Sequence, residues 1–114
     1  MIETITDKNI AELTQASTGV LIISKSDCGH CHTYADEIQA RIEAGGLTGV
    51  NVGKLVLDKP GAAKFKLKNA WVAQLPTLPY TVVFSQGKTL AHFATSKVSY
   101  LEERLEQLAT GAEA

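Results

Sequence analysis

Cys28 and Cys31 are the only cysteines of the chain, and they stand three positions apart with His30 between them and His32 directly after. Two thiols at this spacing can work as a redox pair that cycles between a dithiol and a disulfide. The letters Cys-x-x-Cys-His equally match an attachment site for a c-type haem, with His32 as an iron ligand. The same four side chains could also form half of a zinc site. The rest of the chain has to separate these three chemistries.

The composition of the 114 residues indicates a globular protein with a single domain, residues 1–114, and a frayed tail at 109–114. A net charge of −1 argues against nucleic-acid binding, which usually requires a basic excess. Lys64, Lys66 and Lys68 cluster, and we interpret them as the solvated face of a helix. The longest apolar run, GVLIIS, is too short to cross a bilayer, so no membrane association is expected.

The N-terminal residues lack the basic and then apolar pattern of a secretory signal, so we expect a cytoplasmic protein. In that reducing compartment a Cys-x-x-Cys pair is more often catalytic or metal-binding than structural. Two cysteines three positions apart would also close too short a loop to stabilise a fold. We therefore expect the cysteine pair to have a redox or metal-binding role and not a structural one.

The segments on either side of the motif predict how it is positioned. The run VLIIS (20–24) has the pattern of a strand buried on both faces, and it leads straight into Cys28. After the motif, apolar positions recur at helical spacing and stop at Gly45–Gly46; they are Cys31, Ala35, Ile38 and Ile42. The motif is thus expected between a buried strand and the start of a helix.

The remaining segments complete the order β-α-β-α-β-α-β-β-α. Thr6 or Asp7 is the expected cap of the first helix, and Ser96 and Gly111 are the expected ends of the last one. Pro60 suits a first helical turn, after which Phe65 can pack. The other expected elements are a short strand at 2–5, a helix at 7–17, a strand at 50–58, a helix at 60–71, a hairpin of 80–84 and 89–94, and a helical stripe of Val98, Leu101, Leu105 and Leu108.

This context favours the redox interpretation. At a helix N-terminus Cys28 would face unpaired backbone N–H groups, which stabilise its thiolate, and Cys31 would lie one turn further in, able to resolve a mixed disulfide. Gly29 would let the backbone turn into the helix, and a partial positive charge on His30 would make the pair a better oxidant. A second haem ligand is missing, since Met1 is the only methionine and His92 falls in the hairpin. No second Cys-x-x-Cys completes a zinc site, so no metal or other cofactor is expected.

Four stretches of the sequence resemble the thioredoxin superfamily. CGHC is similar to the motif of protein disulfide isomerase domains, and VLIISKSDCGHC resembles the lead-in of glutaredoxins. VNVGKLVLDKPGAAKFKL and FSQGKTLAHF resemble a strand–helix unit and the hairpin of thioredoxins. The resemblance implies an α/β thioredoxin-like fold, a central mixed sheet flanked by helices. It also implies a cis-proline loop packed against the cysteines.

Pro76 and Pro79 are the candidates for that cis-proline. Pro79 is preferred because its distance from Phe84 fits the family and because Thr77–Pro79 resembles the glutaredoxin Thr-Val-Pro. A cis bond before Pro79 would expose the backbone of Leu78, on which a substrate strand could pair. The expected substrate-binding residues are therefore Leu78, Pro79 and Gly29.

The sequence departs from the family at two positions near the motif. Ile22 stands where thioredoxins carry a buried acid, so deprotonation of Cys31 would fall to a water, to Lys54 as a proton relay, or to His32. Asp27 replaces the usual tryptophan, and its charge is expected to raise the pKa of the Cys28 thiol. Trp71 is expected to pack in the core, with a role in the substrate groove as the alternative.

The resemblance implies a thiol–disulfide oxidoreductase, an enzyme in which Cys28 is the nucleophile and Cys31 the resolving thiol. Its partners would be protein disulfides or dithiols and a reductase, and it would act as a monomer. Glutathione is a weaker candidate partner: Lys25 and the loop 77–79 suit it, but the glutaredoxin Gly-Gly-x-Asp after the hairpin is absent. The alternative, motivated by Ile22 and Asp27, is an interaction module whose dithiol is regulatory or vestigial.

Overall fold

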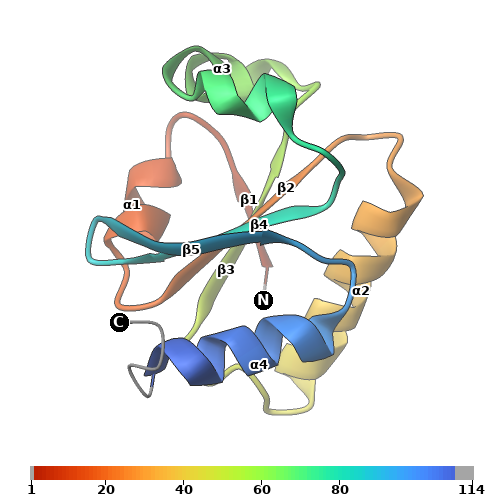
Figure 1. Ribbon diagram of the computed structural model, residues 1–114, viewed down its shortest axis with the longest axis vertical. Coiled ribbons are helices and arrows are strands. Elements are labelled where there is room, and N and C mark those ends of the chain that lie inside the picture. The colour runs from red at the N-terminus through yellow and green to blue at the C-terminus, as the bar shows by residue number, and fades with distance from the viewer. Residues whose placement is uncertain (1, 110–114) are drawn as a thin grey trace.

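A five-stranded mixed sheet forms the centre of the protein, shown in Figure 1 as a computed structural model that describes residues 2–109. Its order is β1-β3-β2-β4-β5; the first three strands are parallel, and β4 and β5 run antiparallel to their neighbours. The strands are β1 (Ile2–Ile5), β2 (Gly19–Ser24), β3 (Asn51–Val56), β4 (Tyr80–Ser85) and β5 (Lys88–Ala94). The helices are α1 (Ile10–Gln15), α2 (Gly29–Glu43), α3 (Ala63–Lys68) and α4 (Val98–Ala109), with 3₁₀ turns η1 (Pro60–Ala62) and η2 (Ala70–Gln74). This is the order predicted from the sequence.

The central strand β2 is buried along its whole length, as its continuous apolar run predicts. It pairs in parallel with β3 on one side and antiparallel with β4 on the other, so both of its edges and both of its faces are covered. Ile22 lies between Lys54 and Thr81 in this register. The strand therefore gives a rigid base to the loop that follows Ser24.

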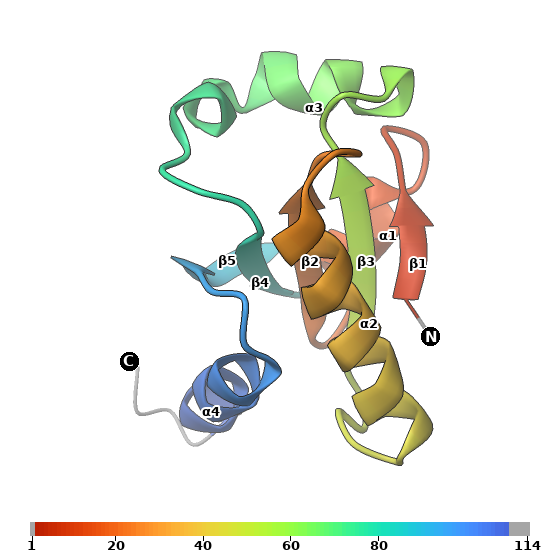
Figure 2. The same ribbon diagram turned by 90° about the vertical axis from the view of Figure 1, so that its right-hand side faces the viewer.

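Helices cover both faces of the sheet and bury two separate apolar clusters (Figure 2). Leu13 of α1 and Phe65 of α3 pack on one face, and Ile38 of α2 and Leu101 of α4 pack on the other. Each fully buried aliphatic side chain contributes about 1.5–3 kcal/mol relative to its exposed state. The predicted helical stripes of α2 and α4 are confirmed by this packing.

The predicted cap of α1 is wrong. The helix begins at Ile10 and follows Asn9, whose amide group accepts from Thr6 N–H at 2.7 Å and donates to the Thr4 carbonyl at 3.0 Å. These bonds fold residues 4–9 into a turn of their own, which delays the helix. Asp7 instead caps α3, because its carboxylate accepts the backbone N–H groups of Lys64 and Phe65, both at 2.9 Å.

The end of the chain needs one further correction. Ser96 is not adjacent to α4: Lys97 precedes Val98, and the Lys97 carbonyl accepts from the N–H groups of Tyr100 and Leu101. Gly111, the predicted end of this helix, lies outside the described residues. No helix within residues 2–109 is both long and apolar enough to cross a membrane.

Candidate active site

Cys28 and Cys31 form a disulfide between the end of β2 and the first turn of α2, with their Cα atoms 5.2 Å apart. The two cysteines differ in accessibility: Cys28 is half-buried, whereas only 2% of Cys31 is exposed. Only the Cys28 side of the pair can therefore meet a sulfur of another molecule.

Cys28 is the N-cap of α2. Its Sγ accepts the backbone N–H of Cys31 at 3.2 Å, and its carbonyl accepts the N–H of His32, also at 3.2 Å. Because α2 runs for 15 residues, this sulfur lies at the positive end of a full helix dipole. Such a position stabilises a thiolate over a thiol, as the sequence predicts for Cys28.

Two side chains hold the loop that carries Cys28. Asp58 Oδ1 accepts from both the backbone N–H and the hydroxyl of Ser26, each at 3.0 Å. The backbone hydrogen bond from Ser26 is the main cause that lowers the pKa of the Asp58 carboxyl. His32 donates its Nε2–H to the Ser26 carbonyl at 2.9 Å, so the ring considered as a haem ligand or proton acceptor braces the loop in this structure.

The peptide bond before Pro79 is cis, as predicted, and it is the only cis bond among the described residues. Pro79 is buried and Leu78 half-buried. Together with His30 they line a hollow of about 300 Å³ that continues over Thr77 and residues 94–96. The loop predicted to bind substrate and the histidine of the motif thus face the same space.

A buried pair of hydroxyl groups, which the sequence did not reveal as a unit, joins α2 to β4. Tyr34 Oη and Thr81 Oγ1 are 3.1 Å apart, and neither residue is exposed. Burial raises the pKa of Tyr34 to about 12. Tyr34 lies three positions after Cys31 on the same helical face, so its spacing was the available signal; nothing in the sequence named Thr81 as its partner.

Ile22 and Lys54, the two positions discussed for proton transfer, are neighbours across the sheet. Ile22 is fully buried in the cluster beneath α2, and Lys54 is half-buried. Within residues 2–109, no hydrogen bond or ion pair joins Lys54 to Cys28 or Cys31. The structure therefore does not bring the predicted relay residue to the sulfur atoms by direct contact.

Two local expectations are wrong. Gly29 is the first residue of α2, has no positive φ and leaves open space where a Cβ would stand, so the turn into the helix does not require glycine. Trp71 is not a core residue: 43% of it is exposed, because η2 holds it at the surface against Phe65 and Tyr80.

Asp27 is exposed beside Cys28. No group of three or more potential metal ligands occurs in the described part of the chain.

Comparison with solved structures shows that the chain has the fold of thioredoxins. No protein-family model matches the sequence, and no curated protein matches it either. Among solved structures, a thioredoxin from Trypanosoma brucei brucei superposes with a TM-score of 0.76 at 16% identity, over 96% of this chain and 92% of that one. Thioredoxin f from spinach chloroplasts gives 0.72 at 14% identity over 92% and 84% of the two chains. Oxidized mitochondrial thioredoxin 3 from Saccharomyces cerevisiae gives 0.71 at 16%, over 93% and 94%.

Proposed function

We propose that this protein, which has the predicted thioredoxin-like fold, is a thiol–disulfide oxidoreductase that exchanges its Cys28–Cys31 pair with protein disulfides. One observation carries the proposal: in a disulfide whose other cysteine, Cys31, is buried, the more accessible sulfur, that of Cys28, caps the first turn of a long helix. A disulfide between cysteines only three positions apart closes a very short loop and adds little to stability. The position of Cys28 at the helix N-terminus is therefore best explained by reactivity.

The reaction in the reducing direction begins with the dithiol form. The Cys28 thiolate attacks one sulfur of the substrate disulfide, the substrate S–S bond breaks, and one substrate sulfur leaves as a thiolate. The Cys31 thiol loses its proton and attacks Cys28 Sγ, which releases the second substrate sulfur and forms the Cys28–Cys31 disulfide. Two electrons pass to the substrate, and its two thiolates take up one proton each. A dithiol donor or a reductase then restores the dithiol form.

The surroundings supply what each step requires. The N-terminus of α2 stabilises the attacking Cys28 thiolate. Burial protects Cys31 from other reactants and keeps it one helical turn from the mixed disulfide. The half-buried Leu78, beside His30, offers backbone groups against which an extended substrate segment can lie.

The test compares the wild type with Cys28→Ser and Cys31→Ser in the reduction of insulin by a dithiol donor. Wild-type protein should accelerate the reduction, and Cys28→Ser should lose at least about a hundredfold of that rate because the nucleophile is gone. Cys31→Ser should accumulate a mixed disulfide through Cys28, detectable by intact mass. Equal rates for wild type and Cys28→Ser would refute the proposal and leave the interaction module as the better description.

A further inference from the structure

The charges of the chain are unevenly distributed around the disulfide. Residues 59–79 contain four lysines and no acidic residue, which gives this segment a net charge of +4. Because the whole chain has a net charge of −1, the other 93 residues together carry −5. A segment of this sign and density attracts anionic groups within a Debye length, about 8–10 Å at physiological salt.

This basic segment lies at the disulfide end of the sheet. Figure 2 shows α3 across the end of the sheet at which β2 leads into α2, and the chain after α3 then descends to β4. Lys64, Lys66 and Lys68 of α3 are all exposed. The lysines of α3 are thus solvent-exposed at the end of the sheet that carries the disulfide.

A second hollow joins α3 to the loop before Cys28. It has a volume of about 350 Å³, and Lys25, Lys66 and Leu78 line it together with Leu57, Asp58, Val72, Ala73 and Leu75. Lys25 and Lys66 come from separate segments of the chain, yet both border the space beside Leu78. Asp58, the single acid there, already accepts two hydrogen bonds from Ser26 through Oδ1.

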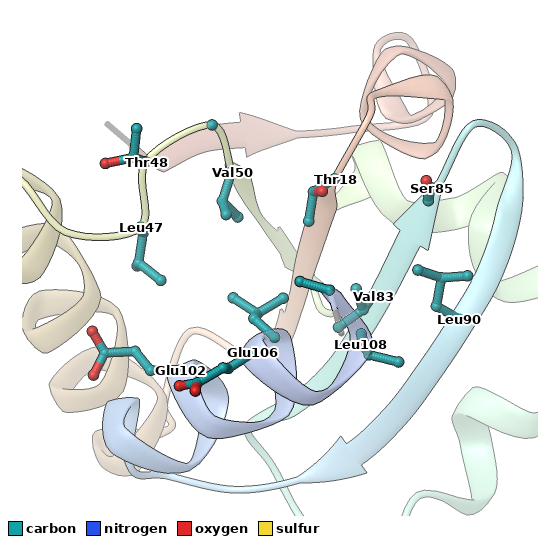
Figure 3. Close-up of a pocket in the computed structure, with 13 residues that line it drawn as sticks. Thr18, Leu47, Thr48, Val50, Val83, Ser85, Leu90, Glu102, Glu106 and Leu108 are labelled. Atoms are coloured by element: carbon teal, nitrogen blue, oxygen red, sulfur yellow. The ribbon is translucent and has the colours of Figure 1, made fainter. Parts of the chain in front are cut away.

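Two exposed apolar side chains belong to the same segment of the chain. Leu67 is 84% exposed and Trp71 43% exposed, the two most exposed large apolar residues of the segment. At the opposite end of the sheet, a pocket of about 530 Å³ is bordered instead by Glu102 and Glu106 (Figure 3). The hollow beside Leu78 is therefore bordered by two lysines and one acid, whereas the opposite pocket is bordered by two glutamates.

We propose that Lys25 and Lys66, the two lysines that border the hollow beside Leu78, bind an acidic, extended segment of the substrate protein next to the disulfide that is exchanged. This inference rests on the proposed function and adds the substrate class. An extended chain advances about 3.3 Å per residue, so side chains two to four residues from a cysteine held near Leu78 reach Lys25 and Lys66.

Electrostatic complementarity of exposed groups acts mainly on the association rate. Each exposed ion pair is worth about 0–1 kcal/mol, so two pairs correspond to roughly a tenfold preference for an acidic over a basic substrate. The preference must fall as salt rises, because the pairs are solvent-exposed.

The experiment uses three disulfide-linked peptides that are identical except for Glu, Gln or Lys at the four positions that flank the cysteine. Reduction by the full chain is measured as kcat/KM at low salt and at about 0.5 M NaCl, where screening is strong. Wild-type protein should prefer the Glu peptide over the Lys peptide about tenfold at low salt and lose the preference at high salt. The double variant Lys25→Glu/Lys66→Glu should invert the preference.

The matched control is Lys88→Glu, which reverses a lysine at the exposed start of β5, near the opposite end of the sheet. It should keep the wild-type preference. Equal rates for all three peptides, or a preference that the double variant retains, would overturn the inference while the oxidoreductase proposal stands. A single-stranded oligonucleotide with the same charge as the Glu peptide is added as a competitor. If it binds the protein more tightly than the Glu peptide does, the inference is also overturned. If no peptide is reduced faster than by Cys28→Ser, the proposed function itself fails, and this inference fails with it.

Discussion

Different kinds of contact hold the loops in place at the two ends of the sheet. At the disulfide end, carboxylates fasten the loops: Asp58 holds the loop before Cys28 through Ser26, and Asp7 caps α3. Both acids accept backbone N–H groups of segments more than 30 positions away in the sequence. The reactive end is thus assembled by ionised side chains.

At the opposite end, backbone groups and aliphatic side chains connect the loops, and one ion pair, between Arg41 and Glu102 at 3.3 Å, joins α2 to α4. The bonds run from Asn51 N–H to the Thr18 carbonyl at 2.9 Å, and from Gln86 and Gly87 N–H to the Ala16 and Thr14 carbonyls at 2.8 Å. Leu47, Val50 and Leu108 line the pocket there (Figure 3). Backbone groups do not titrate, so these hydrogen bonds persist at any pH at which the protein stays folded. The contrast teaches that the loops of the reactive end depend on carboxylates, whereas the loops of the opposite end depend on backbone hydrogen bonds.

The largest expected effect concerns the close approach of backbones at the opposite end. An added Cβ at Gly19 would lie 2.2 Å from the Leu13 carbonyl oxygen, whereas a Cβ at Gly29 would meet nothing within 4 Å. Gly19→Ala should lower the free energy of unfolding by about 3 kcal/mol, and Gly29→Ala should change it by less than about 0.5 kcal/mol. Denaturant titration measures both; equal effects would contradict the contrast between the ends.

The second prediction concerns the uncharged fastening of α2 to β4. Tyr34→Phe and Thr81→Val each leave one hydroxyl buried without its partner, which should cost about 1–3 kcal/mol of unfolding free energy. The double variant removes both groups, so its cost should be at least about 1 kcal/mol below the sum of the two single costs. A strictly additive double-mutant cycle would show that the two hydroxyls do not act as a pair.

The same tyrosine gives the protein an alkaline limit. Its pKa is raised to about 12 in the folded state, against about 10 in an unfolded chain. The neutral form is favoured by folding, so stability is complete below pH 10 and falls as pH rises through the interval up to 12. Tyr34→Phe should lack this decline, and parallel pH curves for the two proteins would contradict the expectation.

Substitution of Asp7 tests whether its carboxylate is needed to stabilise α3, which starts 56 positions later in the sequence. Asp7→Ala should cost about 1 kcal/mol, the usual value of an N-cap, and should raise hydrogen exchange in α3 before other elements. Glu12→Gln, an exposed acid of α1, is the matched control and should change neither quantity. Uniform loss of protection throughout the chain would show that Asp7 acts globally and not on α3.

The smallest effect is expected at Asp58, which is exposed. Its folded-state pKa lies below the ordinary value because the ionised form accepts the Ser26 N–H. It therefore adds stability above about pH 4 and loses that contribution as pH falls through its folded-state pKa. The stability difference between wild type and Asp58→Asn should shrink in acid. A difference that stays the same from neutral to acidic pH would contradict the expectation.

Sequence patterns predicted what depends on neighbouring residues. The apolar run of β2, the helical spacing after Cys31 and the turn at Gln86–Gly87, where both residues have positive φ, are local signals. The cis bond before Pro79 followed from the resemblance of short motifs. These features were sufficient to place both cysteines and the proline loop.

The contacts that complete the site join distant segments, and no local pattern encodes them. Ser26 and Asp58 are 32 positions apart, and Tyr34 and Thr81 are 47 apart. Each partner alone has an ordinary local interpretation: an acid in a turn, a threonine in a strand. Trp71 was misplaced for a related reason, because its exposure depends on how η2 crosses the end of the sheet.

The sulfur that caps α2 is also the atom that would bond to a substrate in the proposed reaction. In the disulfide form Cys28 Sγ accepts the amide hydrogen of Cys31. Each change in the bonding of that sulfur therefore alters the electron density that this amide senses. The Cys31 amide resonance should act as a built-in spectroscopic reporter, with distinct chemical shifts for the disulfide, dithiol and mixed-disulfide states. The catalytic cycle could then be followed at a single N–H group without an added label on the substrate.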